Sequence, residues 1–310
     1  MTITARQRAR RSKGLGGSDA AAVLGLSSFK TALQLFKEKR GEYPVDPAGW
    51  ESEVMWWGRM LEPVVRQRYA KKMGRTVRVP RGTLYHPEHR FMLAHIDGFT
   101  VDEGVDLLTG ELDVTRCRGY EGKTAYHSTG WGEQGTDQIP TDALLQTHHY
   151  LTVTGFPAFD VCALIGRKFA TYEVLADREM SEMLIEQERG FWERVCNGEP
   201  PPLDFGHKTA IDVVKKLYHG TNGARLIASE DAVTWRRKLE RAQRIEKACK
   251  ARIDECKARL LDEMGEAALL AFGDGKAYRR QLTKRKGYEV PESEYIDFRL
   301  VSDPNNHTER

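Results

Sequence analysis

The alternation of apolar and polar residues along the chain predicts a series of amphipathic helices. The clearest begins near Glu53, where apolar residues recur at helical spacing, and it ends at Met73 because Gly74 favours the left-handed backbone that closes a helix. The same periodicity predicts helices over residues 31–41, 139–154, 178–196 and 229–264. The remaining apolar runs are shorter and are better explained as strands.

Short apolar runs bounded by turn residues predict these strands. The runs cover residues 76–79, 83–85, 91–101, 112–125, 159–165 and 171–174. A polar, turn-rich stretch over 102–110 joins two of them as a hairpin, and Gly166 with Arg167 joins another pair. The resulting order, helix–hairpin–helix–hairpin–helix, predicts an α+β fold with a central mixed β-sheet flanked by helices.

A proline run at residues 200–202 marks the strongest candidate domain boundary. We therefore predict a first domain over residues 1–203 and a C-terminal helical and β extension over 204–310. Two strands around 277–281 and 295–300 are expected to end it. The long helix of the extension carries an apolar stripe, which either lies between subunits or packs on its own core. The stripe consists of Trp235, Leu239, Ala242, Ile245, Cys249, Ile253, Cys256 and Leu260.

Composition narrows the class of protein without identifying it. The chain has 310 residues, of which 40% are hydrophobic and 30% charged, as is typical of a globular protein. It has no apolar run of about 18 residues that would span a membrane, and its basic, polar start does not resemble a secretory signal. The five cysteines form no CxxC pair, which favours a reducing cytoplasm and argues against a zinc site.

The distribution of charge says more than its sum. The net charge is only +3, but basic residues gather over 6–13 and again over 279–286. Such clusters neutralise phosphates and attract nucleic acid, although each cluster by itself is equally typical of a solvated tail or loop.

The strongest chemical signal is the tripeptide Glu121-Gly122-Lys123 on a predicted strand. Residues two apart on a strand point to the same face, so the carboxylate and the amine project together. An intrastrand salt bridge is the simplest explanation of this pair alone. Asp97 changes the picture, because it stands among apolar residues on the preceding strand and is costly to bury unless it binds a partner. Asp97, Glu121 and the Gly122 carbonyl together suit Mg²⁺ or Mn²⁺.

These residues, taken together, resemble the core of the PD-(D/E)xK nuclease superfamily, with Ile96 at the place of the proline. Further motifs occur in the order seen in the YqaJ-type viral recombinases, which are similar to lambda exonuclease. These motifs are Leu15-Gly16-Gly17-Ser18-Asp19-Ala20, then Gly58-x-x-Leu61-Glu62-Pro63, then the Asp97/Glu121/Lys123 core, and finally Gln146-x-x-His149-Tyr150. The resemblance covers about residues 10 to 200 and implies a restriction-endonuclease-like fold.

The resemblance also implies roles for individual residues. Glu62 would lie by the metals and bind either a second ion or a water molecule, and Gln146 would contact the nucleophilic water or the scissile phosphate. The expected catalytic set is therefore Asp97, Glu121, Lys123, Gln146 and Glu62, with Mg²⁺ held by Asp97, Glu121, Gly122 and Glu62.

A pocket for the DNA end is expected near the start of the chain. Ser18 at a predicted helix N-terminus, with the backbone of Asp19, offers an anion site. Arg11 is placed to add a grip on a 5′-phosphate, as an arginine and a serine of like spacing do in lambda exonuclease. Tyr150 lies on the helical face of Gln146 and is either a DNA contact or a packed core residue.

The function implied by the resemblance is a Mg²⁺-dependent 5′→3′ exonuclease acting on linear double-stranded DNA in a bacterial host cell. It would leave 3′ single strands for a phage annealing protein, and it would act as a ring-shaped homotrimer. Two alternatives remain: a PD-(D/E)xK endonuclease of the restriction or junction-resolving kind, and a DNA-binding relative without catalytic activity.

Overall fold

The computed structural model describes residues 13–43, 52–101 and 113–283. The chain divides into two compact units, one ending at His219 and the other beginning at Gly220. The segment after the proline run belongs to the first unit, because His207 Nε2 lies 2.9 Å from the Ser27 carbonyl and Val213 is fully buried. This division lies further along the chain than the boundary at residue 203 that the prolines predict.

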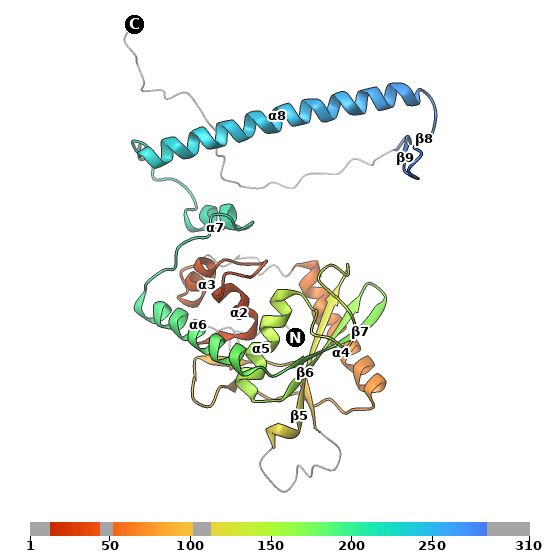
Figure 1. Ribbon diagram of the computed structural model, residues 1–310. Coiled ribbons are helices and arrows are strands. Elements are labelled where there is room, and N and C mark those ends of the chain that lie inside the picture. Colours follow the sequence, from red (N-terminus) through yellow and green to blue (C-terminus); the bar gives the residue numbers. More distant parts are fainter. Residues whose placement is uncertain (1–12, 44–51, 102–112, 284–310) are drawn as a thin grey trace. The chain divides into compact units, whose positions relative to one another are not determined.

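The first unit is built on a four-stranded sheet with the order β4-β5-β6-β7 (Figure 1). Its strands are β4 (Gly98–Val101), β5 (Cys117–Ala125), β6 (Ala158–Ile165) and β7 (Lys168–Leu175). The outer pairs are antiparallel, whereas β5 and β6 run parallel and are connected through helix α5 (Thr141–Thr154). The expected α+β fold with a mixed sheet is therefore confirmed.

Each face of this sheet has its own apolar cover. On one face, Phe159 and Val161 of the sheet pack with Tyr150 and Leu151 of α5 in the largest core cluster. On the other face, helix α4 (Glu53–Met73) packs its residues Val65 and Tyr69 against Tyr120 and Cys162. As predicted, α4 ends at Gly74, whose φ of 66° is left-handed.

A smaller sheet lies beside the first, and it corrects one prediction. It joins β1 (Leu15–Gly16), β3 (Met92–Ala94) and β2 (Leu84–Tyr85), with β1 and β3 parallel. The predicted continuous strand over 91–101 is wrong, because β3 and β4 belong to different sheets. The chain leaves the strand at His95–Asp97, where two polar groups form other hydrogen bonds. The His95 carbonyl accepts from the Tyr150 hydroxyl, and the Asp97 carboxylate accepts from the Gly122 N–H of β5.

Two other predicted strands are shorter than expected. Over residues 76–79 only the single bridge between Arg78 and Phe99 forms. The predicted strand over 112–125 begins at Cys117, after the short 3-10 helix Val114–Arg116.

Helices α2 (Gly17–Val23), α3 (Ala32–Lys39) and α6 (Arg178–Asn197) complete the unit around the small sheet. A fully buried pair joins two of these layers: His149 Nδ1 lies 2.7 Å from Glu188 Oε1 of α6, and His149 Nε2 lies 3.0 Å from the Leu93 carbonyl of β3. The pair therefore fixes α5 against both α6 and the small sheet. The short helix α7 (Ala210–Leu217) follows α6.

The second unit consists of a 35-residue helix, α8 (Glu230–Met264), and a hairpin of β8 (Leu269–Ala271) and β9 (Ala277–Arg279). The strand predicted around 277–281 is present, but it pairs with β8. The segment 295–300, expected as its partner, lies outside the described residues.

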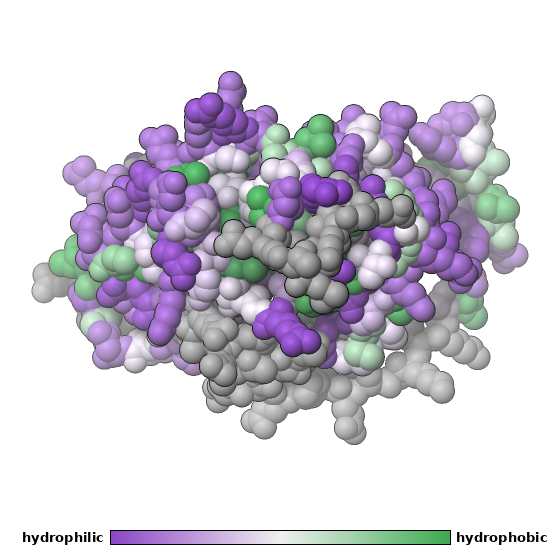
Figure 2. All heavy atoms as spheres, turned by 90° about the horizontal axis from the view of Figure 1, so that it is seen from below, coloured by the Kyte–Doolittle hydropathy of each residue, from purple (hydrophilic) through white to green (hydrophobic). Residues whose placement is uncertain are grey.

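The surface matches the high charge of the sequence. The face drawn in Figure 2 is mostly hydrophilic, with small apolar patches between the charged side chains. Within the described ranges, none of the helices is long and apolar enough to cross a bilayer.

Candidate active site

Two charged side chains of β5 reach toward α5. Glu121 and Lys123 are two residues apart and share a face of the strand. Lys123 Nζ donates to Glu121 Oε1 at 2.7 Å and to Gln146 Oε1 of α5 at 2.8 Å. Gln146 Nε2 donates to the same Glu121 oxygen at 2.9 Å. Three of the residues predicted from the sequence thus form one hydrogen-bonded cluster.

The two carboxylate oxygens of Glu121 differ in their surroundings. Oε1 accepts from both Lys123 and Gln146, whereas Oε2 is buried without a hydrogen-bond partner among the described residues. Glu121 as a whole is 3% exposed. An unsatisfied buried carboxylate oxygen raises the free energy of the folded state, and a bound cation would remove that cost.

Lys123 carries a positive charge at this site. Burial favours the neutral amine, but the Glu121 carboxylate and its hydrogen bond outweigh burial and raise the pKa of Lys123. In the metal-free protein Lys123 is therefore an ammonium group at neutral pH. It can donate hydrogen bonds and stabilise negative charge, but it cannot accept a proton.

Asp97 lies at the edge of the sheet, one residue before β4. Because Gly98 pairs with Tyr120, Asp97 stands level with Glu121 on the neighbouring strand. Its Oδ2 accepts the N–H of Gly122 at 2.9 Å. The N–H and C=O of one residue in an extended strand point to the same edge, so the Gly122 carbonyl also faces the Asp97 side.

The surroundings of Asp97 favour its protonated form. Burial first, and the Glu121 carboxylate second, raise the pKa of Asp97 to about 7. Two carboxylates that repel one another in this way are typical of a site that binds a cation between them.

Glu62 approaches the same place from α4, on the other face of the sheet. Burial and the nearby Asp97 carboxylate raise the pKa of Glu62. Its Oε1 lies 3.6 Å from Arg66 NH1, and the same guanidinium nitrogen donates to the Asp97 carbonyl at 3.4 Å. Arg66, which the sequence motifs did not single out, therefore links Glu62 to Asp97. Its position four residues after Glu62, on the same helical face, is the signal that could have identified it.

The donor set fits a divalent cation that prefers oxygen. The candidate ligands are Asp97, the unpartnered Oε2 of Glu121 and the Gly122 carbonyl, all hard oxygen donors of the kind that Mg²⁺ and Mn²⁺ accept. In the described ranges no three His, Cys, Asp or Glu side chains already converge as a complete metal-binding group. Two carboxylates completed by a backbone carbonyl and water are nonetheless a normal set for Mg²⁺.

Tyr150 contacts the cluster of Glu121, Lys123 and Gln146 through Gln146. Its hydroxyl accepts from Gln146 Nε2 at 2.9 Å and donates to the His95 carbonyl at 3.2 Å. The sequence leaves Tyr150 as either a DNA contact or a packed core residue. These contacts and its burial favour a packed residue that positions Gln146. A Cβ at Gly17 would lie 2.5 Å from the Tyr150 ring and 3.0 Å from the Gln146 carbonyl, so the glycine lets α2 approach α5 closely.

The chain matches a known family over the part that holds this site. Residues 8–157 match the family model of the YqaJ-like viral recombinase domain. We refer to this matched segment, residues 8–157, as the YqaJ-like domain. The chain is 33% identical over 221 residues to the uncharacterized protein YqaJ of Bacillus subtilis (strain 168), which covers 70% of this chain. The match spans 64% of the length of that relative.

Two solved structures are more distantly similar. One is the alkaline exonuclease LHK-Exo from Laribacter hongkongensis, with 17% identity, a TM-score of 0.48, and coverage of 63% of this chain and 94% of that one. The other is a phage related exonuclease from Haemophilus somnus 129PT, with 9% identity, a TM-score of 0.41, and coverage of 60% and 96%.

The start of the YqaJ-like domain differs from the expected phosphate pocket. Ser18 is exposed and lies within α2 rather than before it, since Gly16 is the residue that precedes the helix. Asp19 is buried, and its Oδ2 accepts from the Gly16 N–H at 3.0 Å and from Lys39 Nζ at 2.6 Å.

The charge of Asp19 is therefore compensated inside the protein. Burial disfavours the charge, but Lys39 and Lys30 outweigh it and lower the pKa of Asp19. The contacts of Asp19 tie α2 to α3, and they leave Ser18 as the exposed candidate for a phosphate contact. Arg11, the other candidate, lies outside the described residues.

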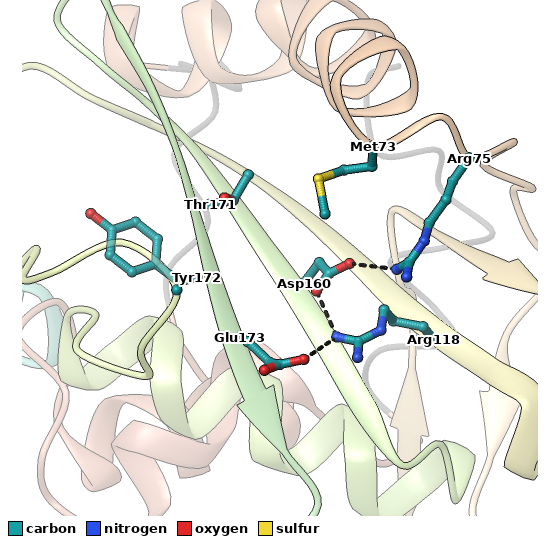
Figure 3. A pocket seen from close by; sticks show the side chains of 8 residues that line it. Met73, Arg75, Arg118, Asp160, Thr171, Tyr172 and Glu173 are labelled. Atoms are coloured by element: carbon teal, nitrogen blue, oxygen red, sulfur yellow. Dashed lines mark hydrogen bonds and ion pairs between the residues drawn. The ribbon is translucent and has the colours of Figure 1, made fainter.

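The first unit also contains a cavity of about 210 Å³ on the α4 face of the sheet. Figure 3 shows Asp160 at its centre between Arg75 and Arg118, with Glu173 on the far side of Arg118. Arg118 NH1 donates to Asp160 at 2.8 Å and to Glu173 at 2.7 Å, and Tyr69 donates to the other Asp160 oxygen at 2.5 Å. These charged side chains form ion pairs with one another, so the cavity is lined by a structural ion-pair network next to the core of the fold.

Proposed function

We propose that this protein is a divalent-metal-dependent deoxyribonuclease with its active site at Asp97, Glu121 and Lys123. The observation that carries the proposal is the buried, unpartnered Oε2 of Glu121 level with Asp97, whose pKa is raised to about 7 by burial and by repulsion from Glu121. The match to the family model of the YqaJ-like viral recombinase domain also supports this proposal.

The residues of this site would have separate roles in metal binding and catalysis. Asp97, Glu121 and the Gly122 carbonyl would hold one Mg²⁺, and Glu62 would contribute to a second. When bound, the metal would polarise the phosphodiester and acidify a water molecule. Lys123, held as an ammonium by Glu121, would stabilise charge on the reacting phosphate.

Gln146 is well placed to orient the attacking water. Its amide is held at both ends: Oε1 accepts from Lys123, and Nε2 donates to Glu121 and to the Tyr150 hydroxyl. An amide held in this way keeps a fixed direction for its remaining hydrogen-bonding capacity, which lowers the entropic cost of ordering a water molecule.

The more specific form of the proposal is a 5′→3′ exonuclease on linear double-stranded DNA. It would leave 3′ single strands for an annealing protein in phage-type recombination, and a homotrimer would enclose the duplex. These features come from the resemblance of the four ordered motifs to the lambda-exonuclease group and belong to the proposal alone.

The test uses the full-length protein and linear duplexes labelled at either the 5′ or the 3′ end, with Mg²⁺ or with EDTA. We expect early release of the 5′ label, retention of the 3′ label, and an intact covalently closed plasmid. Early loss of the 3′ label would reverse the polarity, and a cut plasmid would favour the endonuclease alternative. A duplex left intact under all conditions, with Asp97→Asn indistinguishable from the natural protein, would reject the nuclease itself.

A further inference from the structure

Helix α8 exposes a stripe of apolar side chains along most of its length. Trp235, Leu239, Ile245, Ile253 and Leu261 are all between 48% and 64% exposed. Met264, at the last position, is the only buried residue of this helix. A stripe of this length on a helix with 35 residues, about 52 Å long at 1.5 Å per residue, leaves a large apolar area in water.

A coiled-coil repeat runs through much of this stripe: positions alternately three and four residues apart form the seam between two helices that wind around each other. Ile245 and Leu261 lie beside this repeat. We call the positions of the repeat the seam: Ala232, Trp235, Leu239, Ala242, Glu246, Cys249, Ile253, Cys256 and Leu260. Glu246 is the one charged residue among these nine seam residues.

The positions that flank the seam are mostly basic. These basic flanks are Arg236, Lys238, Lys250, Arg252, Lys257 and Arg259. The acidic residues Glu240, Asp254, Glu255 and Asp262 lie on the opposite side of the helix. Arg252 and Arg259 contact Glu255 within the helix, yet their side chains stay 76% and 77% exposed, so these pairs are weak and leave the charges available to a partner.

This pattern disfavours a second copy of the chain as the parallel partner of α8. A parallel pair would bring the two Glu246 side chains together in the seam and would place Arg252 of each copy beside Lys257 of the other. Like charges at these positions are destabilising and act against pairing. Duplex DNA would neutralise the basic flanks but would leave the apolar seam in water.

We infer that the seam of α8 binds an amphipathic helix of a second protein in a two-stranded coiled coil. The partner helix would carry apolar residues along its own seam, acidic residues facing the basic flanks, and one basic residue opposite Glu246. The inference goes beyond the nuclease activity, since it rests on α8 alone.

The test uses the full-length chain and two synthetic 35-residue helical peptides with leucine seams. The first carries glutamate at its flanking positions and a lysine placed opposite Glu246; the second carries lysine at the flanks and glutamate at that place. Binding is measured by fluorescence anisotropy of the labelled peptides. We expect the first peptide to bind at least about tenfold more tightly, with a preference that shrinks at high salt.

Two sets of charge reversals provide matched controls. The variant K250E/R252E/K257E reverses three of the six basic flanks and should remove most of the preference between the peptides. The variant R241E/R244E/K247E reverses three basic residues that lie outside the seam and flanks, and it should keep the original preference. Ile253→Glu should abolish binding of both peptides because it places a charge in the seam.

Several results would overturn the inference. Equal binding of the two peptides would remove the charge argument, and binding of neither would remove the partner helix. Self-association that is lost in Ile253→Glu, followed by sedimentation, would make a second copy the occupant. Duplex DNA that binds the natural chain and is lost in Ile253→Glu would assign the stripe to nucleic acid.

Discussion

Asp97→Asn should make the metal-free protein more stable while it abolishes nuclease activity. The substitution removes the charge that burial and Glu121 oppose, and the asparagine oxygen can still accept the Gly122 N–H. The sign follows from linkage. Because the folded pKa of Asp97 is raised above its unfolded value, the folded state holds a proton that the unfolded state releases, so stability falls as the pH rises toward 7.

The magnitude follows from the same values. The difference between an ordinary value of 3.8 and about 7 corresponds to about 4 kcal/mol at about 1.4 kcal/mol per tenfold change in proton affinity. Relaxation of the site and the unpaired amide of asparagine reduce this, so we expect about 2–3 kcal/mol at pH 8. For a folded unit of this size that is a rise in Tm of about 4–12 °C.

The assay is thermal unfolding in EDTA at a series of pH values from 5 to 8. The gain for Asp97→Asn should be largest at pH 8 and should shrink as the pH falls below about 7. Mg²⁺ should raise the Tm of the natural protein and leave that of the variant nearly unchanged. The matched control is Asp212→Asn at an exposed position, expected to change stability by less than about 0.5 kcal/mol. A variant equal to or less stable than the natural protein at pH 8 would refute the repulsion argument.

Three further predictions concern the supporting residues. Lys123→Met should lower kcat by about 10²–10³-fold in a label-release assay without weakening DNA binding to the same degree, and an unchanged kcat would remove Lys123 from the reaction. Gly17→Ala should destabilise the domain by about 1–3 kcal/mol in urea unfolding, because its methyl group collides with Tyr150; an unchanged midpoint would contradict the close packing. The raised pKa of His149 means that the stability it contributes is complete below about pH 6.5 and is lost as the pH rises through that raised value. Glu188→Gln should flatten this part of the stability–pH curve, and an identical curve would refute the pairing.

Much of the local structure could be predicted because its causes are local. The periodicity of apolar residues located α4, α5, α6 and α8 to within a few residues, and Gly74 ended its helix as expected. The motif Glu121-Gly122-Lys123 was predicted on a strand with both charged side chains on one face, and this is confirmed. Strand alternation and helix caps depend on neighbours in sequence, which is why the chain alone carries them.

Other features depend on which segments meet. The apolar run over 91–101 predicts one strand, but its two halves pair with different partners and join different sheets, and Asp97 between them accepts the Gly122 N–H. Asp19 caps the start of α2 by accepting the Gly16 N–H, but the ion pair that compensates its buried charge comes from Lys39, 20 residues away.

The residue types of the candidate site were thus determined by the sequence, whereas their electrostatic state was decided by the tertiary structure. The identity of Asp97, Glu121 and Lys123 can be read from the chain. The burial and the Glu121 repulsion that raise the pKa of Asp97, and the burial that leaves Glu121 Oε2 without a partner, exist only once the sheet and α5 have formed around these carboxylates.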